Sequence, residues 1–234
     1  MIIIRKSQDR GHAQHGWLDS YHSFSFADYH DPQWMGFRSL RVINEDRVAK
    51  AQGFGSHPHK DMEIITYVLS GQLKHKDSMG NEGIINPGEI QKMSAGTGVV
   101  HSEFNASSKE EVHLLQIWIM PNAKGLNPAY EQHLLPVDQE NSLFAFPITI
   151  HQDVKIFRGR LSKGQKLCYD LNKERGAWIQ MIHGSVSIDV ASAVEGIGPF
   201  TDSLEAGDAA LIEKERNLKL TAQSNCEFLL FDLK

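Results

Sequence analysis

Short apolar segments, many of them alternating with polar residues, recur along the whole chain and are separated by Gly, Pro, Asn and Asp. Their length and their content of β-branched and aromatic residues predict β-strands. We predict strands at Leu40–Asn44, Met62–Leu69, Gly83–Ile85, Ile90–Met93, Val112–Met120, Val154–Leu161, Trp178–Ile182, Val186–Val190, Ala209–Glu213, Leu218–Thr221 and Glu227–Leu233. Helical periodicity is weak, and only Asn127–Leu134 is predicted to form one or two helical turns. Many short strands with few helices indicate an all-β protein, a sandwich or a barrel.

The two halves of the chain contain similar segments. Ile65–Gly71 is followed after a gap by Asn86–Glu89, and Trp178–Gly184 is followed by Leu204–Asp208. Each pair describes an apolar strand ending at a glycine turn, a hairpin, and a second glycine turn with an acidic residue. We interpret the similarity as two copies of one β-barrel unit.

The turn glycines are spaced differently in the two copies. Gly71 and Gly88 are 17 residues apart, whereas Gly184 and Gly207 are 23 residues apart. A longer loop at Ala191–Thr201, rich in Gly and small residues, accounts for the difference. With a junction near Pro136–Ser142, the predicted domains are residues 1–136 and 137–234.

Candidate metal ligands occur in two pairs in the first half. His57 and His59 flank Pro58, and His101 and Glu103 flank Ser102. Residues i and i+2 of a strand face the same side, so each pair can direct both side chains toward one ion. Pro58 lacks an N–H and is tolerated at the start or the solvent edge of a strand.

Three imidazoles and one carboxylate form a ligand set for a divalent transition metal, if the two strands are antiparallel neighbours. Each pair alone is equally compatible with partly exposed strand histidines. Two pairs beside glycine turns favour metal binding. The set suits Fe, Ni, Mn, Co, Cu or Zn, and affinity order alone does not identify the native metal.

Longer segments around these residues resemble a known family. Gly53–Gly71, which contains His57-Pro-His-Lys-Asp-Met-Glu63, is similar to the first cupin motif, and Gly88–Asn105 is similar to the second. Arg10–Pro32 and His57–Glu63 resemble the pirin family, and the resemblance covers most of the chain. It implies a bicupin, two tandem antiparallel jelly-roll barrels. Among pirins, the similarity is greatest to the bacterial group of quercetin 2,3-dioxygenases.

One departure from the general cupin pattern is informative. Six residues separate the usual glutamate ligand of the first motif from the closing Gly71, and here that position is Ile64. Glu63 lies one residue earlier, which places it on the opposite face of a strand. Pirins are similar in taking their carboxylate from the second motif, so the resemblance implies that Glu103 is the ligand and Glu63 is not.

Only the N-terminal copy is predicted to hold a metal. The C-terminal copy lacks paired histidines at the matching place, and His183 stands alone before Gly184. We therefore expect one divalent metal per chain, Fe(II) first, in the N-terminal barrel. The C-terminal barrel is expected to be degenerate and to hold no metal.

The N-terminal segment also contains a cluster of histidines and aromatic residues. The spacings between the histidines suit no single face, so structural hydrogen bonds are favoured over a second metal site. The aromatic residues are predicted to belong to the core, with some of them at the barrel mouth. The histidines are His12, His15, His22 and His30, and the aromatics are Trp17, Phe24, Phe26, Trp34 and Phe37.

Composition narrows the classes of partner. The net charge is −5 and the sequence contains no run of Lys and Arg, which argues against direct binding of nucleic acid. Cys168 and Cys226 are predicted to be reduced, buried thiols, although a disulfide between them remains open. No signal peptide or apolar stretch of membrane-spanning length is found, so we expect a cytoplasmic protein. We also expect a monomer.

The resemblance implies a metal-dependent dioxygenase that acts on a flavonol such as quercetin, or another enediol or phenol, with O2. In that reaction Glu103 would take the proton of the substrate hydroxyl. The alternative is a metal- or redox-sensing regulatory protein that binds a partner protein. A deep apolar pocket at the metal would favour the enzyme, and a strongly charged exposed patch would favour the regulator.

Overall fold

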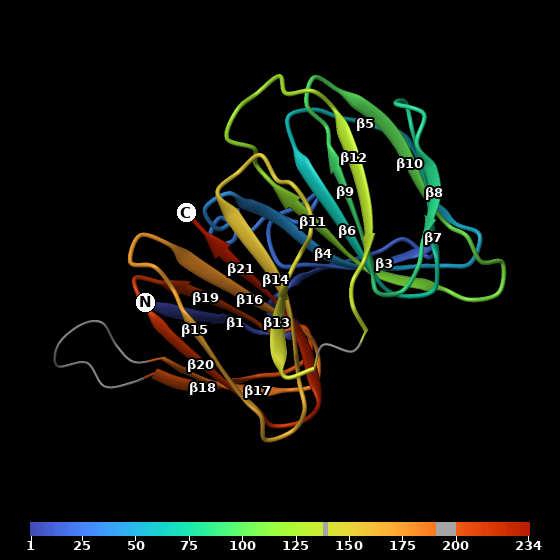
Figure 1. Ribbon diagram of the computed structural model, residues 1–234. Coiled ribbons are helices and arrows are strands. Elements are labelled where there is room, and N and C mark those ends of the chain that lie inside the picture. The colour runs from blue at the N-terminus through green and yellow to red at the C-terminus, as the bar shows by residue number, and fades with distance from the viewer. Residues whose placement is uncertain (138–139, 191–199) are drawn as a thin grey trace. The chain divides into compact units, whose positions relative to one another are not determined.

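The computed structural model describes residues 1–137, 140–190 and 200–234, which are almost entirely β-structure. The chain divides into two compact units (Figure 1). One unit, here called the N-terminal barrel, consists of Gly11–Val137 and Pro147–Gln152. The other, the C-terminal barrel, consists of Met1–Arg10, residues 138–146 and Asp153–Lys234.

Two antiparallel sheets form the N-terminal barrel. The larger has the order β12-β9-β6-β11-β4-β3-β2, and the smaller has the order β5-β10-β7-β8. The strands are β2 (Gly11–Gln14), β3 (Leu18–His22), β4 (Leu40–Val48), β5 (Gly53–His59), β6 (Glu63–Ser70), β7 (Leu73–Asp77), β8 (Glu82–Ile85), β9 (Glu89–Ser94), β10 (Val99–Asn105), β11 (Val112–Ile119) and β12 (Ala129–Leu134).

The C-terminal barrel repeats this plan. Its sheets have the orders β1-β19-β16-β21-β14-β13 and β15-β20-β17-β18. The strands are β1 (Ile2–Arg5), β13 (Ser142–Ala145), β14 (Val154–Leu161), β15 (Lys166–Asp170), β16 (Gly176–His183), β17 (Val186–Val190), β18 (Phe200–Leu204), β19 (Ala209–Glu213), β20 (Asn217–Ala222) and β21 (Cys226–Leu233). A short 3-10 turn, η1 (Ser7–Asp9), follows β1. The all-β, two-barrel prediction is confirmed.

All of the predicted strand segments coincide with strands of the structure, but the predicted helical turns are wrong. Asn127–Leu134 contains β12, which pairs with β9 from Ala129↔Ser94 to Leu134↔Glu89. The helix propensity of these residues is overridden by strand pairing, because β12 covers what would otherwise be an open edge of the larger sheet.

The internal similarity reflects equivalent turns. Gly71 and Gly184 end β6 and β16 with φ of 74° and 72°, a left-handed conformation that favours glycine. A Cβ at either position would lie within 2.4 Å of a backbone oxygen, that of Glu111 or Asn225. Both turns therefore require glycine for conformation and for close packing.

The first ten residues belong to the C-terminal barrel. Ile2–Arg5 pairs with β19, from Ile2↔Ile212 to Arg5↔Ala209. The predicted division at residue 136 assigned this segment to the first barrel, because a short apolar strand carries no signal of its partner. Residues 138–139 of the predicted junction and residues 191–199 of the predicted loop lie outside the described residues.

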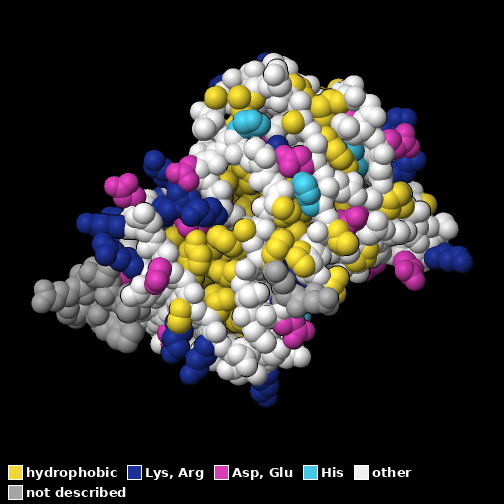
Figure 2. All heavy atoms as spheres, in the orientation of Figure 1, with side chains coloured by type: hydrophobic (Ala, Val, Ile, Leu, Met, Phe, Trp, Pro, Cys, Tyr) yellow, Lys and Arg dark blue, Asp and Glu magenta, His cyan; other side chains and the backbone are white. Residues whose placement is uncertain are grey.

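The cysteines, the possible membrane spans and the surface charge were also predicted from the sequence. Both cysteines are free, but Cys168 is exposed, so the prediction of two buried thiols is wrong for that residue. No helix within the described residues is long and apolar enough to cross a membrane. On the face shown in Figure 2, Lys and Arg form separate groups among acidic side chains.

Candidate metal centre and its cavity

Two adjacent strands of the smaller sheet carry the predicted ligand pairs. β5 and β10 are antiparallel, with His57 opposite His101. The register shifts between His101 and Glu103, where Phe54 is the next partner on β5. This irregularity re-aims the side chains of β5, as bulges near functional sites do. Pro58 lies on the edge strand of this sheet, where its missing N–H costs no ladder bond.

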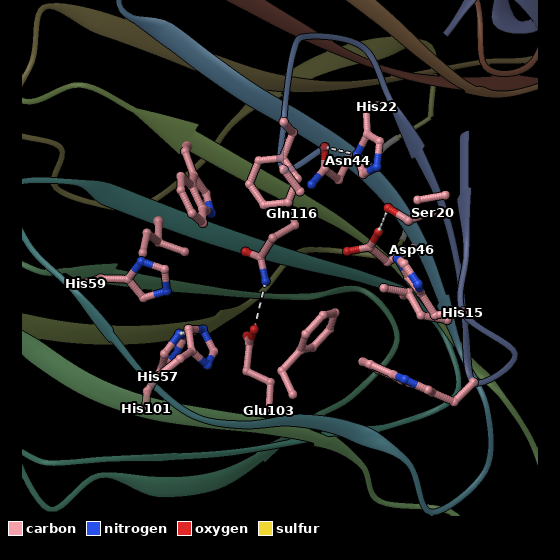
Figure 3. A pocket seen from close by; sticks show the side chains of 18 residues that line it. His15, Ser20, His22, Asn44, Asp46, His57, His59, His101, Glu103 and Gln116 are labelled. Carbon is pink, nitrogen blue, oxygen red and sulfur yellow. Dashed lines mark hydrogen bonds between the residues drawn. The ribbon is translucent and has the colours of Figure 1, made fainter. Parts of the chain in front are cut away.

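The three histidines converge. The Nε2 atoms of His57 and His101 are 3.0 Å apart. Ring centroids are separated by 4.4 Å for His57–His101 and by 4.8 Å for each pair with His59. Two nitrogens bound at about 2.1 Å to one ion, at right angles, would be about 3.0 Å apart. The three rings gather on one side of the cavity in Figure 3.

The hydrogen-bonding state of the rings is suited to a cation. His57 Nδ1 donates to the carbonyl oxygen of Gly55 at 2.7 Å, which leaves the Nε2 lone pair facing His101. His101 Nδ1 is buried and has no hydrogen-bond partner among the described residues. Burial, reinforced by the neighbouring histidines, lowers the pKa of His101 to about 3 and that of His59 to about 4. Neutral imidazoles are the form that binds metals.

Glu103 lies in the same cavity with its carboxylate held by two neighbours. Gln116 Nε2 donates to Oε2 at 2.9 Å, and the Thr66 hydroxyl lies 3.2 Å from Oε1. Glu103 is buried. Its oxygen lies within 4.8 Å of ligand atoms of His75 and His101, but it does not belong to the group formed by His57, His59 and His101. Each oxygen keeps a second lone pair, so the two hydrogen bonds leave it able to bind a cation.

His75 is a histidine near the site that sequence reasoning missed. It lies on β7, opposite Glu103 on β10. Both of its ring nitrogens are engaged, Nε2 with Asp77 at 3.2 Å and Nδ1 with the Gln91 amide at 3.2 Å. These contacts favour a supporting role for His75 over that of a ligand. The only feature of the sequence that could have pointed to His75 is the Asp77 carboxylate two residues later, on the same face of a strand.

Glu63 is engaged elsewhere. Its Oε2 accepts a hydrogen bond from Ser94 at 2.9 Å and lies 3.5 Å from Lys92 Nζ, and its Oε1 lies 3.1 Å from His151 Nδ1. Glu63 and Lys92 are each 1 % exposed. This carboxylate is therefore part of a buried ionic network and takes no part in either histidine group.

Within the part of the chain that the structure describes, the N-terminal histidines do not assemble into a group of possible metal ligands. His12 pairs with Asp19 at 2.6 Å and stacks on Tyr21. His15 and His22 line the cavity, as do the aromatics Trp17 and Phe26.

The histidines open into a cavity of about 370 Å³ within the N-terminal barrel. Its walls are largely aromatic and aliphatic, with polar groups at particular points (Figure 3). Such a lining is typical of sites for small organic molecules. The polar lining residues include His57, His59, His101, Glu103, Gln116, Ser20, His22, Asn44 and Asp46, and the apolar ones include Trp17, Phe26, Phe54, Ile64 and Trp118.

Asp46 is a second buried carboxylate that the sequence did not reveal. It lies on β4, is 3 % exposed and accepts a hydrogen bond from the Ser20 hydroxyl. Burial, with a further contribution from Glu103, raises the pKa of Asp46 to about 7, against the hydrogen bond from Ser20. A carboxyl group in this state in a cavity is a candidate functional group.

The C-terminal barrel has no such polar site at the equivalent positions. Strand registers counted from Gly71 and Gly184 place Tyr169 at the position of His57, and Leu218 at that of His101. Leu220 corresponds to Glu103, and Ile188 corresponds to His75. Leu218, Leu220 and Ile188 belong to the apolar core of that barrel. The fold therefore does not require polar residues at these positions.

Comparison with known proteins agrees with this geometry. Residues 4–119 match the family model described as Pirin, and residues 144–233 match that of the quercetinase C-terminal cupin domain. The chain belongs to the pirin family. It is 47% identical over 239 residues to a protein from Escherichia coli strain K12 named quercetin 2,3-dioxygenase, covering 100% of this chain and 99% of the relative.

Solved structures extend the comparison. The crystal structure of YhhW from Escherichia coli has a TM-score of 0.91 and 47% identity, covering 100% of this chain and 98% of that one. A second structure, of the bacterial pirin YhhW in complex with nickel(II), has a TM-score of 0.90 and 46% identity, covering 100% and 99%. An oxalate decarboxylase from Lactobacillus farciminis, 10% identical with a TM-score of 0.68 and covering 98% and 85%, shares the fold.

Proposed function

We propose that this pirin is a metal-dependent dioxygenase that cleaves a flavonol such as quercetin with O2. The observation that carries the proposal is the convergence of His57, His59 and His101 on one wall of an apolar cavity. The name of the 47% identical relative, quercetin 2,3-dioxygenase, supports the reaction class. A flavonol is flat and mostly apolar, and matches a cavity lined by aromatic side chains.

His57, His59, His101 and Glu103 would hold one divalent transition metal. The nickel(II) complex of the Escherichia coli relative supports a divalent ion, and Fe(II) is the metal we expect in this chain. The Nε2 of His57, which is free of a hydrogen because Nδ1 donates to Gly55, and the lowered pKa values of His59 and His101 fit such an ion. When bound, the metal would supply the Lewis acidity and redox chemistry that allow a flavonol to react with O2.

The chain's own residues would position the substrate and take up its proton. A hydroxyl beside a carbonyl on the flavonol would approach the histidines, and Glu103 would accept the hydroxyl proton on a carboxylate oxygen. Gln116 and Thr66 hold that carboxylate in place. The apolar walls would exclude water, which strengthens the interactions of the charged groups inside the cavity.

The cavity also favours the enzyme over a purely regulatory protein. A sensor that acts by binding a partner needs a surface patch that changes with the metal, whereas a substrate needs enclosed volume. A cavity of about 370 Å³ with aromatic walls directly beside the histidines meets the second requirement.

Oxygen consumption with quercetin tests the proposal. Metal-free protein is reloaded anaerobically with Fe(II), Mn, Co, Ni, Cu or Zn in turn, and O2 uptake and carbon monoxide release are measured. We expect metal-dependent, stoichiometric uptake that is lost in His101→Ala and kept in His183→Ala, which changes the C-terminal barrel. Full metal occupancy with no uptake for any metal would contradict the proposal.

A further inference from the structure

Two cross-strand pairs of polar residues line the side of the cavity opposite the three histidines (Figure 3). On β3 and β4, Ser20 lies directly opposite Asp46 and His22 directly opposite Asn44. All four side chains are at most 3 % exposed. The next inward pair along the same ladder, Leu18 and Val48, is apolar and belongs to the core.

Each pair leaves one polar atom without a protein partner. Ser20 donates to Asp46 Oδ1, and Asp46 Oδ2 has no hydrogen bond from any described residue. His22 Nδ1 and Asn44 Oδ1 are 2.8 Å apart, and the amide nitrogen of Asn44 has no acceptor within the described part of the chain. An acceptor and a donor two residues apart on one strand thus face the cavity. Both atoms are accessible from the cavity, so a polar group of a bound molecule can pair with them.

The barrel fold does not need polar groups at these positions. Strand registers place Phe157 of the C-terminal barrel at the position of Asn44 and Gly159 at that of Asp46. There the ring of Phe228 packs over Gly159, and Phe157 packs against the apolar core. The sister barrel fills with aromatic rings the space that the N-terminal barrel keeps polar and open.

We propose that Asn44 and Asp46 bind a hydroxyl group on the part of the substrate that lies away from the metal. A phenolic hydroxyl can donate to Asp46 Oδ2 and accept from the Asn44 amide, which satisfies both atoms. The substrate class is then a planar aromatic compound with a metal-binding oxygen pair at one end and a further hydroxyl at the other. This inference rests on the proposed function, because it assumes that the histidine end holds the metal.

Binding of two matched ligands tests the inference without turnover. Quercetin and 3-hydroxyflavone share the same hydroxyl–carbonyl pair, but 3-hydroxyflavone carries no other hydroxyl. Dissociation constants for both are measured at pH 8, above the pKa of Asp46, with metal-loaded, full-length protein under anaerobic conditions. We expect the wild type to bind quercetin at least about tenfold more tightly, the value of one hydrogen bond to a charged group. Burial of apolar surface alone would favour 3-hydroxyflavone.

Variants assign the preference to these residues. Asp46→Leu is expected to remove most of the preference for quercetin, with little change in the affinity for 3-hydroxyflavone, and Asn44→Leu to reduce it. Glu45→Leu, one residue along β4 and outside the cavity lining, is the control and should keep the preference. Circular dichroism and metal content establish that each variant is folded and loaded.

The outcomes separate the two proposals. Equal, metal-dependent binding of both ligands by the wild type would overturn the role of Asn44 and Asp46 and leave the proposed function standing. A preference that survives in both leucine variants would also overturn it. Binding of neither ligand would overturn the proposed function together with this inference. If a variant does not fold, the wild-type affinities for quercetin and 3-hydroxyflavone still test the inference.

Discussion

His57 and His101 lie directly opposite each other on β5 and β10, with their Nε2 atoms 3.0 Å apart. His57 Nδ1 donates to the Gly55 carbonyl, so the lone pair of His57 Nε2 faces His101. A hydrogen on His101 Nε2 can occupy this gap in the metal-free protein, and a cation would take its place. With His59 close by, three neutral imidazoles can then direct their lone pairs toward one ion.

Two overlapping groups of ligand atoms share His101, and substitution distinguishes them. We expect His57→Ala to weaken metal binding by more than about 100-fold. Removing a residue that binds the metal directly costs more affinity than removing a residue that only supports the ligands. His75→Gln should reduce affinity by no more than about tenfold, because both nitrogens of His75 are already engaged. Metal content after dialysis against a competing chelator measures both. Loss of the metal in His75→Gln alone would assign the site to the other group.

Glu103 has a proposed role as ligand and as proton acceptor. Glu103→Gln keeps the size of the side chain but removes the charge and the basic oxygen. We expect the rate of quercetin turnover to fall by about 10²–10⁴-fold, the usual contribution of a general base. Metal should remain bound through the three histidines, although more weakly. A variant with full metal and unchanged turnover would remove Glu103 from the mechanism.

Asp46 makes the stability of the metal-free protein depend on pH. Its pKa is raised from 3.8 to about 7 by burial first, so the folded state holds a proton that the unfolded state has lost between these values. The stabilising contribution is complete below pH 3.8 and is lost as the pH rises through 7. Asp46→Asn should therefore gain roughly 2–4 kcal/mol in the free energy of unfolding relative to the wild type between pH 4 and pH 8.

Urea unfolding of both metal-free proteins across this range measures the difference, with Glu45→Gln on the same strand as control. A gap between wild type and Asp46→Asn that stays constant from pH 4 to pH 8 would contradict the assignment.

Lys92 is the only cation within 4.0 Å of the Glu63 carboxylate that is not a histidine, among the residues that the structure describes. Lys92→Met leaves a buried carboxylate without its main counter-charge and should destabilise the protein by about 3–5 kcal/mol. The double variant Lys92→Met/Glu63→Gln should recover part of this loss. Because Glu63 faces away from the histidines, Glu63→Gln should retain one metal per chain. Loss of the metal in that variant would make Glu63 a ligand.

The sequence predicted those parts of the site that local spacing encodes. His57, His59 and His101 are recognisable because i and i+2 positions of a strand share a face. Asn44, Asp46 and His75 lie within short runs of polar residues, and Gln116 stands between apolar ones. Only the non-local pairing of β3, β4, β7, β10 and β11 shows which of these side chains are directed to the site. A polar residue in a strand is otherwise read as solvent-facing.

The fold shows the same limit. Alternation and glycine turns were sufficient to predict eleven strands and the duplication, because these are local signals. The pairing of β1 with β19 joins residues 2–5 to residues 209–212, which no local pattern encodes. The propensities of Asn127–Leu134 favoured a helix, and the exposed edge of β9 determined the outcome.

We expect His57, His59 and His101 to bind one metal ion together. Metal-free protein is titrated with Ni(II) under anaerobic conditions, and X-ray absorption at the nickel edge is recorded at one equivalent. We predict saturation at one ion per chain, with outer-shell scattering from three imidazoles that falls to two in His57→Ala held at saturating nickel. Saturation without imidazole scattering, or no binding above the level of the His57→Ala/His101→Ala double variant, would contradict it.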